Sequence, residues 1–144
     1  MPAPDNSEKS VIDALYQISR VVNNTDDPRD ALESIIDQII QVLPAESAAI
    51  ELINPDTQTL EIEVSRGFAS DPCDVTLPLG QGITGWVALH GKPVNIGDVQ
   101  QDPRYVEIDD RVHSELAVPM HGEDGGILGV VNIDSTELNA FNDQ

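Results

Sequence analysis

Apolar residues near the start of the chain recur at the spacing of an α-helix. Between residues 7 and 22 they fall three or four positions apart, which places them on one stripe: Val11, Leu15, Ile18 and Val22. A second apolar stripe follows and ends at Leu43. Asp27 is a candidate N-cap for this second helix, and Pro28 suits its first turn. We therefore predict two helices within residues 7–43.

The pattern changes to the two-residue period of β-strands from residue 47 onward. Apolar and polar residues alternate on both sides of the turn-forming segment Asn54–Gln58, which predicts an antiparallel hairpin. A short helix is expected at residues 83–89, and the polar stretch Gly97–His113 has no sustained period. The same reasoning predicts four further strands, at residues 75–79, 93–96, 115–120 and 127–133.

This order of elements predicts the fold class α+β, with a central antiparallel β-sheet of about six strands. We expect the N-terminal helices to cover one face of the sheet. The short helix and the insertion Gly97–His113 are then available to cover the other face. A loop longer than about 12–15 residues inside a compact domain is usually functional or disordered, so this insertion is a candidate part of a binding site.

Composition narrows the classes of partner and cofactor. Aromatic residues make up only 3% of the chain, so the core must be aliphatic and offers few stacking platforms for a flat cofactor. The net charge is −19, and a field of that sign repels phosphate backbones and anionic lipids. We therefore expect neither a nucleic-acid partner nor a membrane partner.

Cysteine and histidine usage argues against several kinds of site. Cys73 is the only cysteine, so neither an intramolecular disulfide nor a cysteine-based zinc site can form. His90, His113 and His121 show no metal-ligand spacing on a common face. Residues 1–10 are polar and lack the apolar stretch of a signal peptide. These observations predict a cytoplasmic protein with no metal site and no identifiable cofactor.

Three glycines, Gly80, Gly82 and Gly85, match the spacing of a dinucleotide-binding loop, G-x-G-x-x-G. That loop requires a buried parallel strand before it and a full crossover helix after it. Here the preceding strand carries Pro78 and the following helix is too short. We therefore interpret the glycines as a tight turn between a strand and a helix.

Four blocks of sequence resemble the GAF domain, a small-molecule-sensing module of many signalling proteins. They are Leu77–Trp86, Gly91–Asp98, Ser114–Pro119 and Leu128–Ser135. The Asp-Pro-Arg-Tyr run at residues 102–105 resembles a further element of that family. The resemblance implies a GAF/PAS-like sheet and a single domain over residues 1–144. Within it, residues 7–43 form the N-terminal helices, 47–135 the sheet and ligand-pocket region, and 136–144 the start of a truncated C-terminal helix.

The resemblance also implies where a ligand would bind. In GAF domains the short helix borders the ligand cavity, and the Ser-Glu pair at the start of a strand recurs beside it. Two acids near one cavity suit a cationic group, although they suit pairing with an arginine equally well. The candidate ligand-binding residues are Trp86, Asp98, Arg104, Tyr105, Arg111, Ser114, Glu115 and Asp134.

The GAF family contains several functional classes. Free methionine-(R)-sulfoxide reductases resemble this chain at Ser114-Glu115 and at Ile133-Asp134-Ser135, but their chemistry needs a nucleophilic and a resolving thiol. The cyclic-nucleotide class has an Asn-Lys signature that is absent here, and the bilin class has a cysteine-histidine pair that is also absent. We therefore expect a domain that is not an enzyme.

The function implied by the resemblance is that of a sensory or regulatory GAF domain in a larger signalling protein. Such a domain binds a small molecule and relays the event through its terminal helices to a covalently linked output domain. A homodimer through the N-terminal helices is the expected assembly. The competing hypothesis is a structural GAF domain that dimerises without any ligand.

Overall fold

The computed structural model describes residues 28–43, 45–68, 76–106, 110–122 and 124–141. The first predicted helix, the candidate N-cap Asp27 and the single cysteine, Cys73, lie outside these residues. The predicted dimer contact through the first helix is therefore not addressed by the structure. No helix in the described part of the chain has the length and apolar character needed to cross a membrane.

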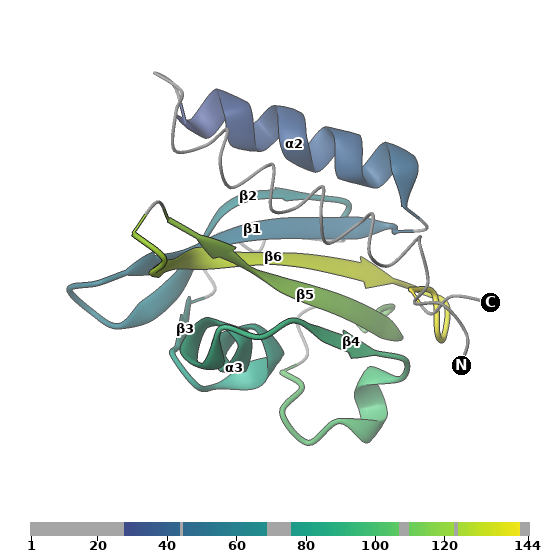
Figure 1. The fold of residues 1–144 in the computed structure, drawn as a ribbon. Helices are drawn as coiled ribbons and strands as arrows, with labels where there is room; N and C mark the ends of the chain where they lie inside the picture. Colours follow the sequence, from purple (N-terminus) through teal and green to yellow (C-terminus); the bar gives the residue numbers. More distant parts are fainter. Residues whose placement is uncertain (1–27, 44, 69–75, 107–109, 123, 142–144) are drawn as a thin grey trace, which may run out of the picture.

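A six-stranded antiparallel sheet forms the centre of the fold, in the order β3-β2-β1-β6-β5-β4 (Figure 1). This confirms the predicted α+β class and the strand count. Long strands occupy the middle of the sheet and three-residue strands its two edges. The strands are β1 (Ser47–Asn54), β2 (Thr59–Arg66), β3 (Thr76–Pro78), β4 (Val94–Ile96), β5 (Ser114–His121) and β6 (Ile127–Ser135).

Helix α2 (Pro28–Val42) covers one face of the sheet, as the apolar stripe of its sequence predicts (Figure 1). Asp30 lies in the first turn, where a negative charge complements the helix dipole. We call the apolar layer beneath this helix the α2-side core. Its buried members are Leu32, Ile35, Ile36, Ile39, Ala48, Ile50, Val64, Leu116, Val118, Met120, Val131, Ile133 and Phe141.

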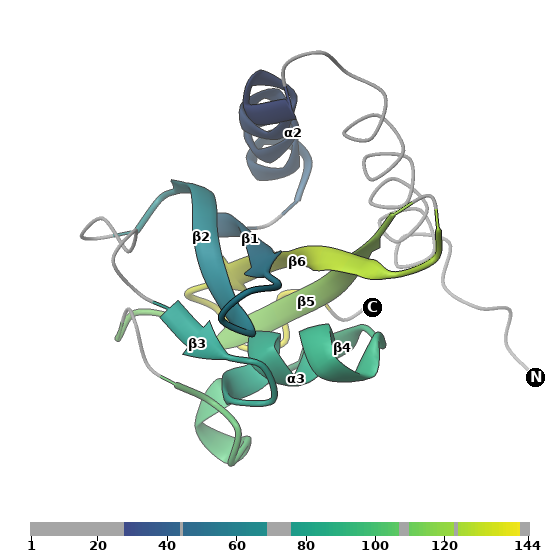
Figure 2. The same cartoon turned by 90° about the vertical axis from the view of Figure 1, so that its left-hand side faces the viewer.

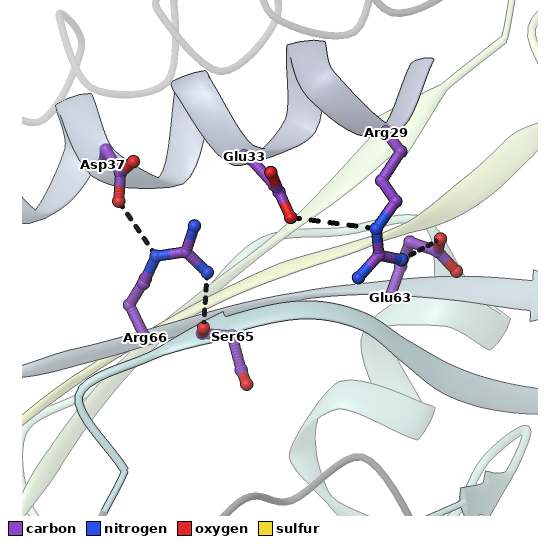
Figure 3. A network of polar contacts seen from close by, with 6 residues as sticks. All are labelled: Arg29, Glu33, Asp37, Glu63, Ser65 and Arg66. Carbon is purple, nitrogen blue, oxygen red and sulfur yellow. Dashed lines mark hydrogen bonds and ion pairs between the residues drawn. The ribbon is translucent and has the colours of Figure 1, made fainter. Parts of the chain in front are cut away.

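Ion pairs at the edge of this layer connect α2 to strand β2 (Figure 3). Arg29 Nη1 donates to Glu63 Oε1 at 2.8 Å, and Arg66 Nε donates to Asp37 Oδ1 at 3.0 Å. All four side chains are substantially exposed, so each pair contributes at most about 1 kcal/mol to stability. The position of α2 therefore depends mainly on its buried apolar face.

Helix α3 (Gly82–His90) lies on the opposite face of the sheet (Figure 2). A side chain at Gly85 would bring its Cβ to 2.9 Å from the Pro78 carbonyl oxygen, so the helix packs too closely on the preceding turn for any other residue. The helix ends at Gly91, whose φ of 69° is in the left-handed region that favours glycine. The glycine segment is therefore a structural turn, as its context in the sequence predicts.

The insertion after β4 lies on the same side of the sheet as α3 (Figure 1). It contains the short 3₁₀ helix η1 (Val99–Gln101), and Val99 and Val112 are buried in the apolar cluster with α3. A backbone hydrogen bond from Val99 N to His113 O, at 2.9 Å, joins the two ends of the insertion, and one from His113 N to Ser135 O, at 2.8 Å, attaches it to the end of β6. The expectation that the insertion covers part of the second face is thus met by the residues described.

Residues 136–141 form turns where the sequence led us to expect the start of a C-terminal helix. Asn139 has a φ of 54°, which interrupts a right-handed helix, and its N–H donates to the Gly97 carbonyl at 2.9 Å. The hydroxyl of Ser114 donates to the Glu137 carbonyl at 2.6 Å. These local hydrogen bonds take the place of a helical turn in this part of the segment.

Candidate functional site

Ionisable side chains are buried on the face of the sheet that α3 covers. Alternate residues of a strand point to opposite faces. Glu51, Glu115 and Asp134 therefore share a face with Ala117 and Val130, two members of the apolar cluster beneath α3. Strand register pairs Glu115 of β5 directly with Asp134 of β6. Asn132 lies one row further along β6 and pairs with Ala117 on one side and with Ala49 on the other.

We call Glu51, Glu115, Asp134 and Asn132 the carboxyl cluster. Their exposed fractions are 4%, 5%, 3% and 6% respectively. Asn132 Nδ2 donates to Asp134 Oδ2 at 3.3 Å, while Asn132 Oδ1 has no hydrogen-bond partner among the described residues. Glu51 is hydrogen-bonded to the side chain of Thr84, so the cluster contacts helix α3 directly. A buried oxygen without a donor is costly, which makes this arrangement unusual for a purely structural core.

Burial changes the protonation of these acids. It raises the pKa of Glu51 to about 7, although the Thr84 hydrogen bond acts in the opposite direction and the Asp134 charge adds a further increase. It also raises the pKa of Glu115 well above its usual range, and the charge of Asp134 and a hydrogen bond with Asp134 act in the same direction. The cluster therefore retains protons close to neutral pH.

An aromatic and charged group lies next to the cluster. The Arg104 guanidinium carbon is 4.9 Å from the centre of the Trp86 ring, a cation–π distance, and the His90 ring stacks on Trp86 with centroids 4.2 Å apart. Arg104 forms two side-chain hydrogen bonds with Asp102, at 2.9 Å and 2.6 Å. These bonds lower the pKa of Asp102 and raise the pKa of Arg104, to which the charge of Glu115 also contributes.

The remaining predicted site residues have other surroundings. Tyr105 is half-buried and packs against the apolar cluster beneath α3. Asp98 accepts a hydrogen bond from Gln100 N and so caps η1. Arg111 is exposed and donates to the Gly67 carbonyl at 3.2 Å. Ser114 holds the C-terminal turn through Glu137, on the strand face opposite to that of Glu115.

The structure thus brings Glu115 and Asp134 together, with Trp86 and Arg104 beside them. The hydrogen bonds described for Asp98, Arg111 and Ser114 are to other parts of the chain. Sequence reasoning missed Glu51, Thr84, Asn132 and Asp102 as members of this region. Glu51 alternates with apolar residues in the sequence, a pattern that does not show whether its side of the strand is exposed or covered. The short helix and the insertion were expected to cover the second face of the sheet. A central strand that is covered on both faces has no solvent-facing side, so this expectation already pointed to the burial of Glu51.

The chemistry available here is that of hydrogen-bond acceptors and shared protons. Three carboxyl groups and an amide oxygen provide acceptors, and the described donors within the group are the Thr84 hydroxyl, the Asn132 amide nitrogen and the protons that Glu51 and Glu115 retain. In the described part of the chain, no three histidine, cysteine, aspartate or glutamate side chains converge closely enough to hold a metal ion. The arrangement suits a ligand that donates several hydrogen bonds.

Relatives of this chain include regulatory and signalling proteins. It is 42% identical over 62 residues to the dual 3′,5′-cyclic-AMP and -GMP phosphodiesterase 11A of Takifugu rubripes, covering 40% of this chain and 7% of the relative. It is 36% identical over 76 residues to protein YtsP of Bacillus subtilis, covering 53% and 46%. It is 22% identical over 128 residues to the Nif-specific regulatory protein of Azospirillum lipoferum, covering 83% and 20%. The matches therefore span less than half the length of each of these relatives.

Solved structures share the same fold. A free methionine-R-sulfoxide reductase from Neisseria meningitidis, in complex with its substrate, superposes with a TM-score of 0.76 at 23% identity, covering 99% of this chain and 83% of that one. The GAF domain of an Acinetobacter phosphoenolpyruvate-protein phosphotransferase superposes with a TM-score of 0.72 at 21% identity, covering 97% and 84%. Identities this low show the fold alone. Since a sequence model of the GAF domain matches residues 25–144, nearly the whole chain, this protein belongs to the GAF domain family.

Proposed function

We propose that this GAF domain is a non-catalytic sensory domain that binds a small polar molecule between the sheet and α3. The observation that carries this proposal is the carboxyl cluster, a set of buried acids around an amide oxygen that lacks a donor. Burying acids together, and an amide oxygen without a donor, destabilises a fold, so their presence favours a binding role over a packing role. Trp86 and Arg104 supply a further contact surface next to Glu115.

The cysteine content of the chain favours binding over reductase chemistry. Reduction of a sulfoxide by thiols needs a nucleophilic thiolate and a second thiol to resolve the oxidised sulfur. Cys73 is the only cysteine of this sequence. We therefore propose that the acids serve recognition and that no covalent step takes place. Purified protein given free methionine sulfoxide and a thiol reductant is expected to show no turnover.

A sensory role also requires that ligand binding be transmitted to another part of the protein. We propose that binding under α3 is passed through the terminal helices of a homodimer to an output domain in the same polypeptide. Similarity to a Nif-specific regulatory protein and a cyclic-nucleotide phosphodiesterase supports a regulatory setting of this kind. Sedimentation equilibrium of the full chain tests the dimer, and a monomer at high micromolar concentration would contradict it.

A thermal-shift screen of polar metabolites tests the binding proposal. A molecule that binds the folded state raises the melting temperature in a saturable manner. The expected result is at least one such molecule whose effect is lost in both Glu115→Gln and Asp134→Asn. Glu137→Gln removes an exposed carboxyl and is the matched control, which should keep the full shift. If no molecule changes the melting temperature, the ligand-free structural domain becomes the better account.

A further inference from the structure

The acids of the carboxyl cluster lie at two separate places along the sheet. Glu115 and Asp134 form one row, which ends on β1 at Ser47. Glu51 lies four residues further along β1, opposite Val130. Four residues of a strand extend about 13 Å, so the Cα of Glu51 is well separated from the Glu115–Asp134 row. The two places nevertheless influence each other, because the charge of Asp134 acts on Glu51 and that of Glu51 acts on Glu115.

Short side chains lie between these two places. The intermediate row of the sheet consists of Ala49, Asn132 and Ala117. The exposed fractions of the three residues are 1%, 6% and 0%. Asn132 Oδ1, the oxygen that lacks a donor, belongs to this middle row. We call the sheet surface that carries these three rows, beneath α3, the floor of the site. It has acids at both ends and an unsatisfied acceptor in the middle.

Two observations restrict what would fit this floor. The acids do not converge on one point, since no three described carboxyl groups could hold a metal ion. The neighbouring cation, Arg104, already forms two hydrogen bonds with Asp102. A ligand that satisfies the floor must therefore be extended and must donate hydrogen bonds at both ends.

We propose that the carboxyl cluster recognises an extended ligand with two positively charged donor groups, one bound by Glu115 and Asp134 and the other by Glu51. This inference rests on the proposed sensory function and adds the chemical class of the ligand. An ammonium group has three N–H donors. One such group suits the Glu115–Asp134 pair, and a second suits Glu51. The connecting chain lies over the alanines, where Asn132 Oδ1 accepts from either donor group.

Binding of such a ligand is coupled to loss of protons. In the free protein the titratable and charged groups that face Glu51 and Glu115 are Asp134, Asp102 and Arg104, with Thr84 on α3. Burial holds Glu51 and Glu115 protonated close to neutral pH. A cation that replaces one proton gains about tenfold in affinity for each pH unit of increase while the acid stays protonated in the free protein.

Calorimetric titration of the full chain with four probes tests this inference. The probes are 1,4-diaminobutane, n-butylamine, 1,4-butanediol and calcium chloride, at pH 6 and pH 7 in 150 mM salt. The expected result is one site for the diamine with at least tenfold higher affinity than for the monoamine, and no binding of the diol or of calcium. The diamine affinity should rise by more than about tenfold between the two pH values, because its two ammonium groups replace protons on both Glu51 and Glu115.

Variants at Glu51 separate this inference from the proposed function. Glu51→Gln should reduce diamine affinity to the level of the monoamine, and Glu51→Asp, which keeps the charge, should restore part of the difference. Glu137→Gln should leave all affinities unchanged. Equal affinity for diamine and monoamine, or equal binding of calcium, overturns the two-cation inference while a hit in the metabolite screen keeps the sensory function. Absence of binding by every probe also overturns the inference, and failure of the metabolite screen is needed to overturn the sensory function as well.

Discussion

The two faces of one sheet are both covered by a helix, yet they bury different chemistry. Beneath α2 the buried polar side chains are Ser114 and Ser135, whose hydroxyls hydrogen-bond to the C-terminal turn. Beneath α3 the buried set includes three carboxyl groups and an asparagine. The α2-side core is therefore organised for stability. The carboxyl cluster on the α3 side costs stability as pH rises through neutral, which is the pattern expected where a fold reserves one face for binding.

The largest effect is expected from a cavity in the α2-side core. Ile50 is fully buried at the centre of β1. Ile50→Ala should lower the free energy of unfolding by about 3 kcal/mol, since large-to-small core substitutions cost about 2–5 kcal/mol. The loss should be the same at pH 5 and pH 8, because no titratable group belongs to this cluster. Urea unfolding at the two pH values measures it, and a loss that varies by more than about 1 kcal/mol would contradict the separation of the two faces.

The next effect concerns Glu51 and depends on pH. Its pKa rises from 4.5 to about 7 on folding, so the folded state holds more protons than the unfolded state between these values. Stability is then present in full below pH 4.5 and falls as pH rises through 7. Glu51→Gln removes this decrease and should stabilise the protein by up to about 3 kcal/mol at pH 8, since the pKa rises from 4.5 to about 7 and one pKa unit corresponds to about 1.4 kcal/mol.

The control for this prediction is Glu137→Gln, which removes one exposed carboxyl without touching the cluster. The comparison is the difference in unfolding free energy between each variant and the unaltered protein at pH 5, 6, 7 and 8. Glu51→Gln should gain with rising pH relative to Glu137→Gln. Parallel pH profiles for the two variants would show that Glu51 ionises in the folded state as easily as an exposed acid.

The smallest effect is expected from the arginine beside the site. Arg104→Gln breaks its bond with Asp102 and its cation–π contact with Trp86, and should cost about 1 kcal/mol. Because Trp86 is the only tryptophan, its fluorescence should change in this variant. Arg29→Gln, which breaks an exposed ion pair on the α2 side, is the matched control and should cost less than about 0.5 kcal/mol with unchanged fluorescence. Unchanged fluorescence in Arg104→Gln would show that Arg104 does not contact Trp86 in solution.

The sequence predicts the α2 side of the molecule well. Apolar residues at helical spacing in α2 report directly on which side chains are buried, because burial of apolar area is the main driving force. The alternation in β1 and β2 predicts the strands themselves, but β1 is buried on both faces. The strand order is not contained in these local patterns. It depends on which distant strands pair, such as β1 with β6, and we made no prediction of it.

The α3 side is predicted only in part. Glu115 and Asp134 were candidates from the resemblance, and strand register then pairs them. Glu51 follows the alternation of a half-exposed strand, and local pattern cannot distinguish a solvent-facing acid from one covered by a helix 30 residues later in the chain. Asn139 illustrates the same limit, since its left-handed conformation depends on a hydrogen bond to Gly97, 42 residues away.

The central claim is that the face beneath α3 carries carboxyl groups that hold protons near neutral pH. A carbon-13 NMR titration of the side-chain carboxyl signals between pH 4 and pH 9 tests it most directly, with Glu51→Gln identifying the Glu51 signal by its loss. The account predicts a Glu51 midpoint near 7 and a Glu115 midpoint well above the usual range for glutamate. If both residues instead titrate below pH 5, they ionise as solvent-exposed acids do and the account is contradicted.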